Sequence, residues 1–375
     1  MNVRSISFAL AVLVAFPVTA YDLTRVNFNY LYDPGSPISA TFLPISGEGE
    51  QLNLFAQIAM ESDFEISFFT QTSYDQRKET FLTPSRIDTL TQTELAISFQ
   101  FPISELESIL VLYAQGENGE EFYFPVEIDF SRLPGFYLTE EVPLTGNFAR
   151  TVPGVVHPSG KQTYAYGYPG SFGLADPPFG NMQALSPSID IDTLFAYGEN
   201  APLKDCNFYF LQEDTTTSVG IGFLKCAPYF PRYRRVEELV GPLEYLCSAK
   251  EFESIVTAPA LRSAFQDFWI KVAGSEESAR RAIRRYYRGV TVSNLYFTNY
   301  KPGWQTDQGM IYLIYGMPDE VVRTDRKEIW RYDNKLSFEF LKISTLLAPT
   351  LYTLIRNSEY KDSWIQRIRI LRAGL

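Results

Sequence analysis

The spacing of the apolar residues changes once along this chain, near Pro231, and this change limits what the chain can fold into. Before Pro231, short runs of β-branched and aromatic residues are broken by turn residues, and several runs alternate apolar with polar positions, as in residues 122–128. Such alternation is typical of strands with one buried face. After Pro231 the apolar residues recur at about every 3.6 positions, which is typical of amphipathic helices. We therefore predict a multidomain, β-rich protein whose C-terminal part also contains helices.

The β-rich part divides into two segments. The first, residues 21–131, has strand-like runs and turn signals such as Glu117-Asn118-Gly119, a predicted hairpin tip, and we predict an antiparallel β-sandwich here. The second, residues 132–231, has a Gly- and Pro-rich connection at 166–181, and its pattern leaves open whether it is a separate domain or an extension of the sandwich. The predicted strands are 27–30, 51–59, 65–70, 94–99, 109–114, 122–128, 136–139, 163–168, 188–197, 207–212 and 218–225.

Residues 232–375 are predicted to form an α+β domain with helices packed on a mostly antiparallel sheet. Ser275, followed by two glutamates, is a suitable start for one helix, because a hydroxyl cap and early acidic residues match the exposed amide groups there. The predicted helices are 236–246, 261–272, 279–290 and 360–371, and the predicted strands are 310–315, 321–323, 328–332, 336–343 and 351–355.

Residues 1–20 have the pattern of a secretory signal peptide. Arg4 precedes the apolar run 6–16, and Val-Thr-Ala at the end fits the small-residue rule for cleavage. We predict cleavage after Ala20, which gives an exported protein in the periplasm or associated with the outer membrane. A run of about eleven apolar residues is short for a membrane-spanning helix, which needs about 20, so an uncleaved anchor is the weaker alternative.

The charge balance and the scarcity of metal-binding side chains exclude several classes of function. The chain has 33 Lys and Arg against 44 Asp and Glu, a net charge of -11, which disfavours a nucleic-acid partner. One His and 3 Cys are too few for the usual zinc, iron–sulfur or His-based catalytic sites. We expect neither a metal nor a cofactor.

Two of the cysteines are placed at the two ends of a predicted hairpin. Cys206 and Cys226 lie at matching distances from the polar tip at 213–217. In an oxidising compartment we predict a disulfide between them at the base of the hairpin. Such a loop closure contributes about 3 kcal/mol. We interpret Cys247 as a small apolar residue within a helix.

The most specific signal is the run Gly303-Trp304-Gln305-Thr306-Asp307. Glycine permits close backbone approach, the Trp ring is predicted to be a core anchor, and Thr and Asp side chains bond nearby backbone amides. Further along, the run 311–316 ends at Gly316, Pro318-Asp319-Glu320 forms a turn, and Trp330 lies in a strong strand pattern.

With these residues, about 255–345 of the chain resembles the GWxTD-domain proteins of bacterial envelopes. Gln308 and Met317 depart from the family pattern, which commonly has a basic residue and a proline at these two places. The resemblance implies an envelope location and a domain type rather than a reaction.

Three carboxylates border turns in this region, namely Asp307, Asp319 and Glu320. We favour the interpretation that they bond to their own backbone and cap turns. The alternative is a glycan-processing or glycan-binding site that combines them with aromatic platforms, such as the tyrosines at 164, 166 and 168 with Phe172. The sequence offers no convincing catalytic set, so we assign no catalytic residue and favour a protein without enzymatic activity.

Five arginines are concentrated on one predicted helix: Arg280, Arg281, Arg284, Arg285 and Arg288. The helical period places 280, 284 and 288 on one face, and the last helix adds Arg367, Arg369 and Arg372. One interpretation is a solvated face that pairs with acidic residues of the same chain. The other is a docking surface for an acidic partner or for lipid phosphates.

Our leading hypothesis is an exported, non-catalytic envelope protein that acts through protein–protein contacts as a scaffold or accessory subunit. The expected partners are one or more envelope proteins, with peripheral contact to membrane or glycan as a further expectation. The alternative is the glycan-binding or glycan-processing envelope protein described above.

Overall fold

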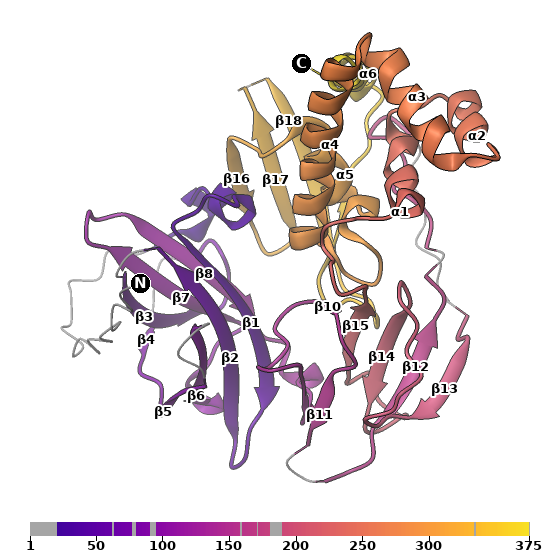
Figure 1. Cartoon of the computed structure of the whole chain (residues 1–375). Helices are drawn as coiled ribbons and strands as arrows, with labels where there is room; N and C mark the ends of the chain where they lie inside the picture. Colours follow the sequence, from indigo (N-terminus) through magenta and orange to yellow (C-terminus); the bar gives the residue numbers. More distant parts are fainter. Residues whose placement is uncertain are drawn as a thin grey trace, which may run out of the picture.

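The computed structural model describes residues 21–61, 64–76, 80–90, 95–157, 160–170, 172–180, 190–333 and 335–374. The predicted signal peptide lies outside these residues. The chain is β-rich, with an N-terminal sandwich, a second sheet beside it, and an α+β part above both in the view of Figure 1. The predicted fold class is confirmed, although the exact domain boundaries stay a prediction.

The N-terminal part is a sandwich of two 4-stranded antiparallel sheets, with strand orders β1-β2-β6-β5 and β4-β3-β7-β8. Leucines of both sheets fill the space between them, among them Leu54 and Leu112, which are fully buried. Gly119 has a positive φ of 80° at the β7–β8 turn, so the predicted hairpin tip is confirmed. The strands are β1 Ile38–Ser46, β2 Gln51–Met60, β3 Phe64–Gln71, β4 Thr80–Leu82, β5 Arg86–Thr89, β6 Leu95–Pro102, β7 Ile109–Gly116 and β8 Glu121–Glu127.

The predicted strand at 27–30 is wrong, because short 3-10 turns occupy this region, η1 (Leu23–Arg25) and η2 (Asn29–Tyr32). The side-chain oxygen of Asn27 accepts a bond from the backbone of Asn29 at 3.1 Å, which favours a turn over an extended strand. Both asparagine side chains also donate to the carbonyl oxygen of Asp319. This segment therefore joins the N-terminal part to the C-terminal part.

The second β-rich segment forms a 5-stranded sheet in the order β10-β15-β14-β12-β13 and a 2-stranded sheet of β9 and β11. Apolar residues cover both faces of the larger sheet, with Leu211 on one face and Phe210 on the other. Part of the predicted run 188–197 lies outside the described residues. The strands are β9 Tyr137–Thr139, β10 Phe148–Ala149, β11 Gly154–Val156, β12 Tyr164–Tyr168, β13 Thr193–Ala196, β14 Phe208–Gln212 and β15 Ile221–Lys225.

The C-terminal part places helices against a 4-stranded antiparallel sheet in the order β16-β17-β18-β19. Helix α5 contacts α4, α6 and β19, and Trp269 and Trp330 are fully buried in the same core. The elements are α1 Val236–Val240, α2 Ala249–Val256, α3 Leu261–Ala273, α4 Glu276–Phe297, α5 Asp307–Tyr315, β16 Glu320–Arg323, β17 Lys327–Tyr332, β18 Leu336–Ile343, β19 Leu351–Leu354 and α6 Tyr360–Ala373.

One predicted element of this part is wrong, since the run 310–315 forms helix α5 instead of a strand. A short, continuous apolar run has no period that separates a buried strand from a buried helix. All residues from 308 to 315 are buried, so the helix shows no polar face. By contrast, Ser275 caps α4 as predicted, because its side chain accepts a bond from the amide of Ser278.

Among the residues that the structure describes, none of the helices combines the length and the apolar character needed to cross a membrane.

Candidate functional site

Gly303 brings the 3-10 turn η6 (Gly303–Gln305) into backbone contact with helix α4. A Cβ atom at this position would overlap the carbonyl oxygen of Ser293, and the residue is buried. The amide of Gly303 donates to the hydroxyl oxygen of Thr298 at 3.0 Å. No residue with a side chain fits here unless the backbone of α4 shifts.

Trp304 fixes the same turn from the other side. Its ring is 4% exposed, and its indole nitrogen donates to the hydroxyl oxygen of Tyr233 at 2.9 Å. The ring also meets the edge of Tyr245, with centroids 6.1 Å apart. The predicted role of Trp304 as a core anchor is confirmed.

Thr306 caps helix α5. Its hydroxyl oxygen accepts a bond from the amide of Gly309 at 3.0 Å and donates to the carbonyl oxygen of Gly303 at 2.7 Å. A Cβ atom at Gly309 would overlap that same carbonyl oxygen. The Thr hydroxyl group and the two glycines thus set how the turn enters the helix.

Asp307 uses both of its carboxylate oxygens inside the fold. Oδ1 pairs with the guanidinium group of Arg356 at 2.6 Å, and Oδ2 accepts a bond from the amide of Leu354 at 2.8 Å. The Arg356 side chain is only 3% exposed and also donates to the carbonyl oxygen of Asp176 at 3.0 Å. Asp307 therefore ties the start of α5 to the end of β19 and to the loop around Asp176.

The amino group of Lys301 lies near this pair. It donates to the carbonyl oxygen of Gly173 at 2.8 Å, and burial lowers the pKa of Lys301 to about 8 against the opposing effect of Asp307. Loop 173–178 is thus held by bonds from Lys301 and Arg356.

The three turn carboxylates are not brought together. Asp319 accepts a bond from the amide of Asp333 at 2.7 Å, and Glu320 pairs with Arg331 at 2.6 Å on the surface. Each carboxylate, including Asp307, has its own partner, and none of them lines the two hollows described below. Asp307 and Asp319 bond backbone amides as interpreted, but these amides belong to Leu354 and Asp333 and not to their own turns, and Glu320 bonds a side chain. Gly316, with a φ of 86°, ends α5, and Pro318 follows it in the turn to β16.

The aromatic residues around β12 do not share one open face. Tyr168 is buried against Phe208, whereas Tyr164 is 39% exposed. Phe172 packs edge-on against Tyr300, with ring centroids 4.9 Å apart. A continuous stacking platform is therefore not formed by these side chains.

Sequence reasoning placed Glu328 in a predicted strand with Trp330 but missed that it is a buried carboxylate. Its Oε1 accepts bonds from Tyr32 at 2.7 Å, Gln308 at 2.9 Å and Trp330 at 2.6 Å. Its Oε2 pairs with Arg323 at 2.7 Å, and Glu328 is 0% exposed. The period of two along β17 was a usable signal, because it puts Glu328 on the same inward face as Trp330.

This network gives Gln308 a role. Gln308 donates to Glu328, whose other oxygen already pairs with Arg323. The Arg323 guanidinium group lies over the rings of Phe28 and Tyr32, 5.5 and 5.8 Å from their centroids. It also lines a small polar hollow of about 190 Å³ where the three parts of the chain meet.

The five arginines of α4 fall into two groups. Arg280 and Arg281 pair with Glu276 and Glu277 at 3.6 and 2.8 Å, and these four side chains are exposed. Arg284 is also exposed on this helix. Arg285 and Arg288 are exposed as well, but they line a cleft, so the five arginines are divided between a solvated face and a concave one.

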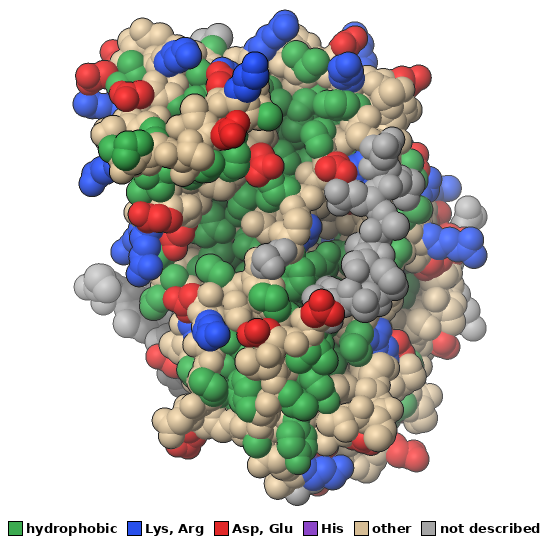
Figure 2. All heavy atoms as spheres, turned by 90° about the vertical axis from the view of Figure 1, so that its right-hand side faces the viewer, with side chains coloured by type: hydrophobic (Ala, Val, Ile, Leu, Met, Phe, Trp, Pro, Cys, Tyr) green, Lys and Arg blue, Asp and Glu red, His purple; other side chains and the backbone are tan. Residues whose placement is uncertain are grey.

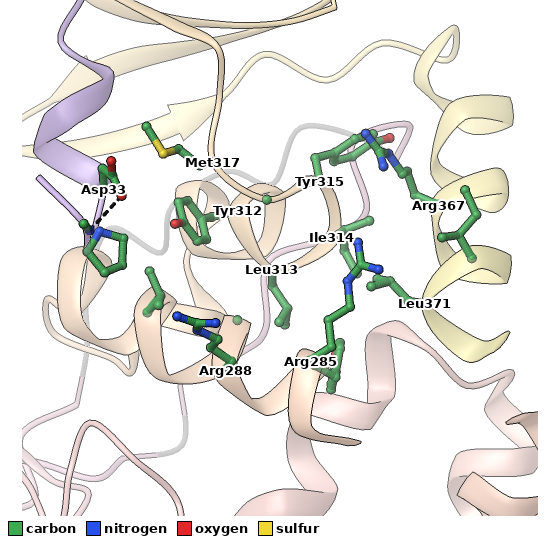
Figure 3. Close-up of a pocket in the computed structure, with 17 residues that line it drawn as sticks. Asp33, Arg285, Arg288, Tyr312, Leu313, Ile314, Tyr315, Met317, Arg367 and Leu371 are labelled. Atoms are coloured by element: carbon green, nitrogen blue, oxygen red, sulfur yellow. Dashed lines mark hydrogen bonds between the residues drawn. The ribbon is translucent and has the colours of Figure 1, made fainter. Parts of the chain in front are cut away.

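The cleft has a volume of about 490 Å³ and lies between α4, α5, α6 and the segment 33–35. Figure 3 shows Arg285 and Arg288 on one side, Arg367 of α6 on another, and Tyr312 to Tyr315 of α5 between them. The Arg367 guanidinium carbon lies 5.8 Å from the centroid of the Tyr315 ring. The arrangement is a concave, partly apolar surface with a cationic rim.

The cysteines do not form the predicted bridge in this structure. Cys206 and Cys226 are free thiols, the first exposed and the second buried. The amide of Cys206 donates to the carbonyl oxygen of Lys225 at 2.7 Å, so the two residues lie on neighbouring backbone segments. Burial raises the pKa of the Cys226 thiol, and it raises that of Cys247 to about 12. The disulfide stays a prediction for the oxidised protein.

Within the described ranges, no three His, Cys, Asp or Glu side chains come close enough together to hold a metal ion.

Comparison with known proteins identifies the region that contains this site. The family model of the GWxTD domain matches residues 207–373, a longer stretch than the 255–345 predicted from the motifs. The match begins one residue before strand β14 and runs to the last residue of α6. Searches of the curated proteins and of the solved structures found no match.

Proposed function

We propose, from the premise that residues 207–373 form a GWxTD domain, that this protein is an exported, non-catalytic envelope protein that acts through protein–protein contacts. It works in the periplasm or at the outer membrane as a scaffold or accessory subunit. The observation that carries the proposal is that both carboxylate oxygens of Asp307 are bonded within the fold, to Arg356 and to the amide of Leu354.

A general acid, base or nucleophile must reach the substrate atom with which it exchanges a proton or forms a bond. The Asp307 side chain is 11% exposed and both of its oxygens are bonded, and Thr306 uses its hydroxyl group in a helix cap. Trp304 is buried against its neighbours. The signature residues therefore support a structural role for the motif, and the surfaces around it are left for binding.

The proposal is tested by crosslinking in intact cells followed by affinity capture of the mature protein. We expect an envelope protein to be captured in stoichiometric amounts. The proposal is overturned by turnover of a substrate that is lost in Asp307→Asn, measured at a temperature at which both proteins are folded. Capture of cell-wall glycan alone would also count against it.

Export is tested separately, by fractionation and by mass spectrometry of the N-terminus. The signal-peptide pattern of residues 1–20 supports a mature chain that begins at Tyr21 in the periplasmic or outer-membrane fraction. Recovery of an intact N-terminus in the cytosol would contradict this part of the proposal.

A further inference from the structure

We propose that the cleft between α4, α5 and α6 binds an acidic segment of a partner protein that also carries apolar side chains. This inference rests on the proposed function, because it names the surface and the chemistry of the protein–protein contact.

The rim of the cleft has an excess of positive charge. Arg285, Arg288 and Arg367 line it together with one carboxylate, Asp33, whose Oδ1 accepts a bond from the amide of Gly35 at 2.8 Å. In the described part of the chain, no carboxylate forms an ion pair with Arg288 or Arg367. Guanidinium groups that form no ion pair within the protein can bind the carboxylates of a ligand through paired, charge-assisted hydrogen bonds.

The floor of the cleft is apolar. Leu313 and Ile314 of α5 lie between the arginines in Figure 3, and Met317 continues the floor towards Asp33. A ligand with negative charge but no apolar side chains would leave this apolar floor without a complementary contact. A ligand with both carboxylates and apolar side chains complements the floor and the rim together.

The charge of the whole chain makes the cleft selective. The net charge is -11, so an acidic partner is repelled over most of the surface and attracted where arginines are concentrated. Arg288 of α4 and Arg367 of α6 line different sides of the cleft (Figure 3), so a segment with more than one acidic side chain can pair with both.

The same features disfavour a lipid surface as the ligand. On the outer face of α4, Glu276 and Glu277 pair with Arg280 and Arg281, which reduces the projecting positive charge. On the face that carries α2, α3 and β13, acidic and basic side chains are interspersed (Figure 2). A broad anionic membrane at the cleft would also meet the paired charges on α4, whereas a narrow peptide segment enters the cleft and meets its lining.

The inference is tested by fluorescence anisotropy with labelled octapeptides and the full mature chain. The probe alternates Glu and Leu, and the two control peptides alternate Lys with Leu and Glu with Ser. Vesicles of phosphatidylglycerol and phosphatidylethanolamine test the lipid alternative. We expect salt-sensitive binding of the Glu–Leu peptide and weaker binding of both control peptides and of the vesicles.

Two double variants with the same change of charge locate the binding site. The cleft variant is Arg288→Glu with Arg367→Glu, and the control on the solvated face is Arg280→Glu with Arg284→Glu. Arg285 is left unchanged because it already has an interaction within the protein. We expect the cleft variant to bind the Glu–Leu peptide at least about tenfold more weakly, and the control less than about twofold more weakly.

Several results would overturn the inference. The first is an equal loss of affinity for the Glu–Leu peptide in the cleft variant and in the control variant. The others are a Glu–Ser peptide that binds as tightly as the Glu–Leu peptide, vesicles that bind more tightly than it, or no binding of the Glu–Leu peptide at all. Crosslinking in cells then separates the two proposals. If the cleft variant still captures the partner of the natural chain, the inference fails and the proposed function stands. If the natural chain captures no protein, the proposed function fails as well.

Discussion

Helix α5 separates two regions that use charged side chains in opposite ways. At its N-terminal end, Asp307 and Arg356 are paired with each other within the fold, and Gly303 lies against α4. Along its other side, Arg288 and Arg367 line an open cleft. The first region contains the residues by which the domain is recognised, and its polar groups hold the fold together. A signature can thus mark an architecture while a neighbouring surface stays open to solvent.

The sharpest test of the structural role is Gly303→Ala. The added methyl group overlaps the carbonyl oxygen of Ser293, which belongs to the backbone of α4 and cannot move alone. We expect the free energy of unfolding to fall by more than about 4 kcal/mol, measured by urea denaturation. The matched control is Gly146→Ala, where a Cβ atom meets nothing within 4 Å. A stability change as small as that of the control would show that the turn does not lie against α4.

The next effect in size is that of Asp307→Asn. The substitution leaves the charge of Arg356 buried without its counterion, and we expect a loss of about 3 kcal/mol in the free energy of unfolding. Asp319→Asn is the control, because the Asp319 carboxylate lies on the surface, where it accepts a bond from the amide of Asp333. If Asp307→Asn is as stable as the natural chain, the pair does not support the fold and a functional role for Asp307 becomes the better explanation.

The same contrast explains what the sequence could predict. The alternation of apolar and polar residues and the helical period predicted most of the strands and helices. The glycine that permits close backbone approach, the Trp anchor and the polar residues around Thr306 indicated a tight turn. Helix α5 was not predictable in this way, because its residues 308 to 315 are buried and leave no polar face.

The sequence predicted less of the candidate site than of the fold. The Asp307–Arg356 pair joins residues 49 positions apart, and the cleft joins residue 33 to residue 371. Local patterns contain no information about such contacts. The arginine pattern on α4 was visible, but which arginines face the cleft depends on how α4 packs on α5 and α6.

The surface pair of Glu251 and Arg372 joins α2 to α6. It is intermediate between the Asp307–Arg356 pair and the two cleft arginines that form no ion pair in the described residues. The hydrogen bond from Arg372 lowers the pKa of Glu251 from 4.5 to about 2. Because the folded-state pKa is below the ordinary value, the stabilisation is complete above pH 4.5 and is lost as the pH falls towards 2. Both side chains are partly exposed, at 27% and 26%, so we expect less than about 1 kcal/mol.

This pH dependence is measured by urea denaturation of the natural chain and of Glu251→Gln at pH 6, 4 and 3. The stability difference between them should shrink as the pH falls. Arg372→Gln should behave like Glu251→Gln. Arg367→Gln, on the same helix, should keep a constant difference from the natural chain, because its arginine lines the cleft without a carboxylate partner in the described residues. A constant difference for Glu251→Gln would show that the pair does not form in solution.

The smallest effect on stability is expected in the cleft itself. Arg288→Ala with Arg367→Ala removes two charges that form no ion pair in the described part of the chain, and Arg288 is exposed. The free energy of unfolding should change by less than about 1 kcal/mol, including the contact of Arg367 with the Tyr315 ring. Urea denaturation measures this change beside that of Asp307→Asn. A loss as large as that of Asp307→Asn would mean that these arginines also hold the fold together, and the distinction between a structural motif and an open binding surface would no longer apply.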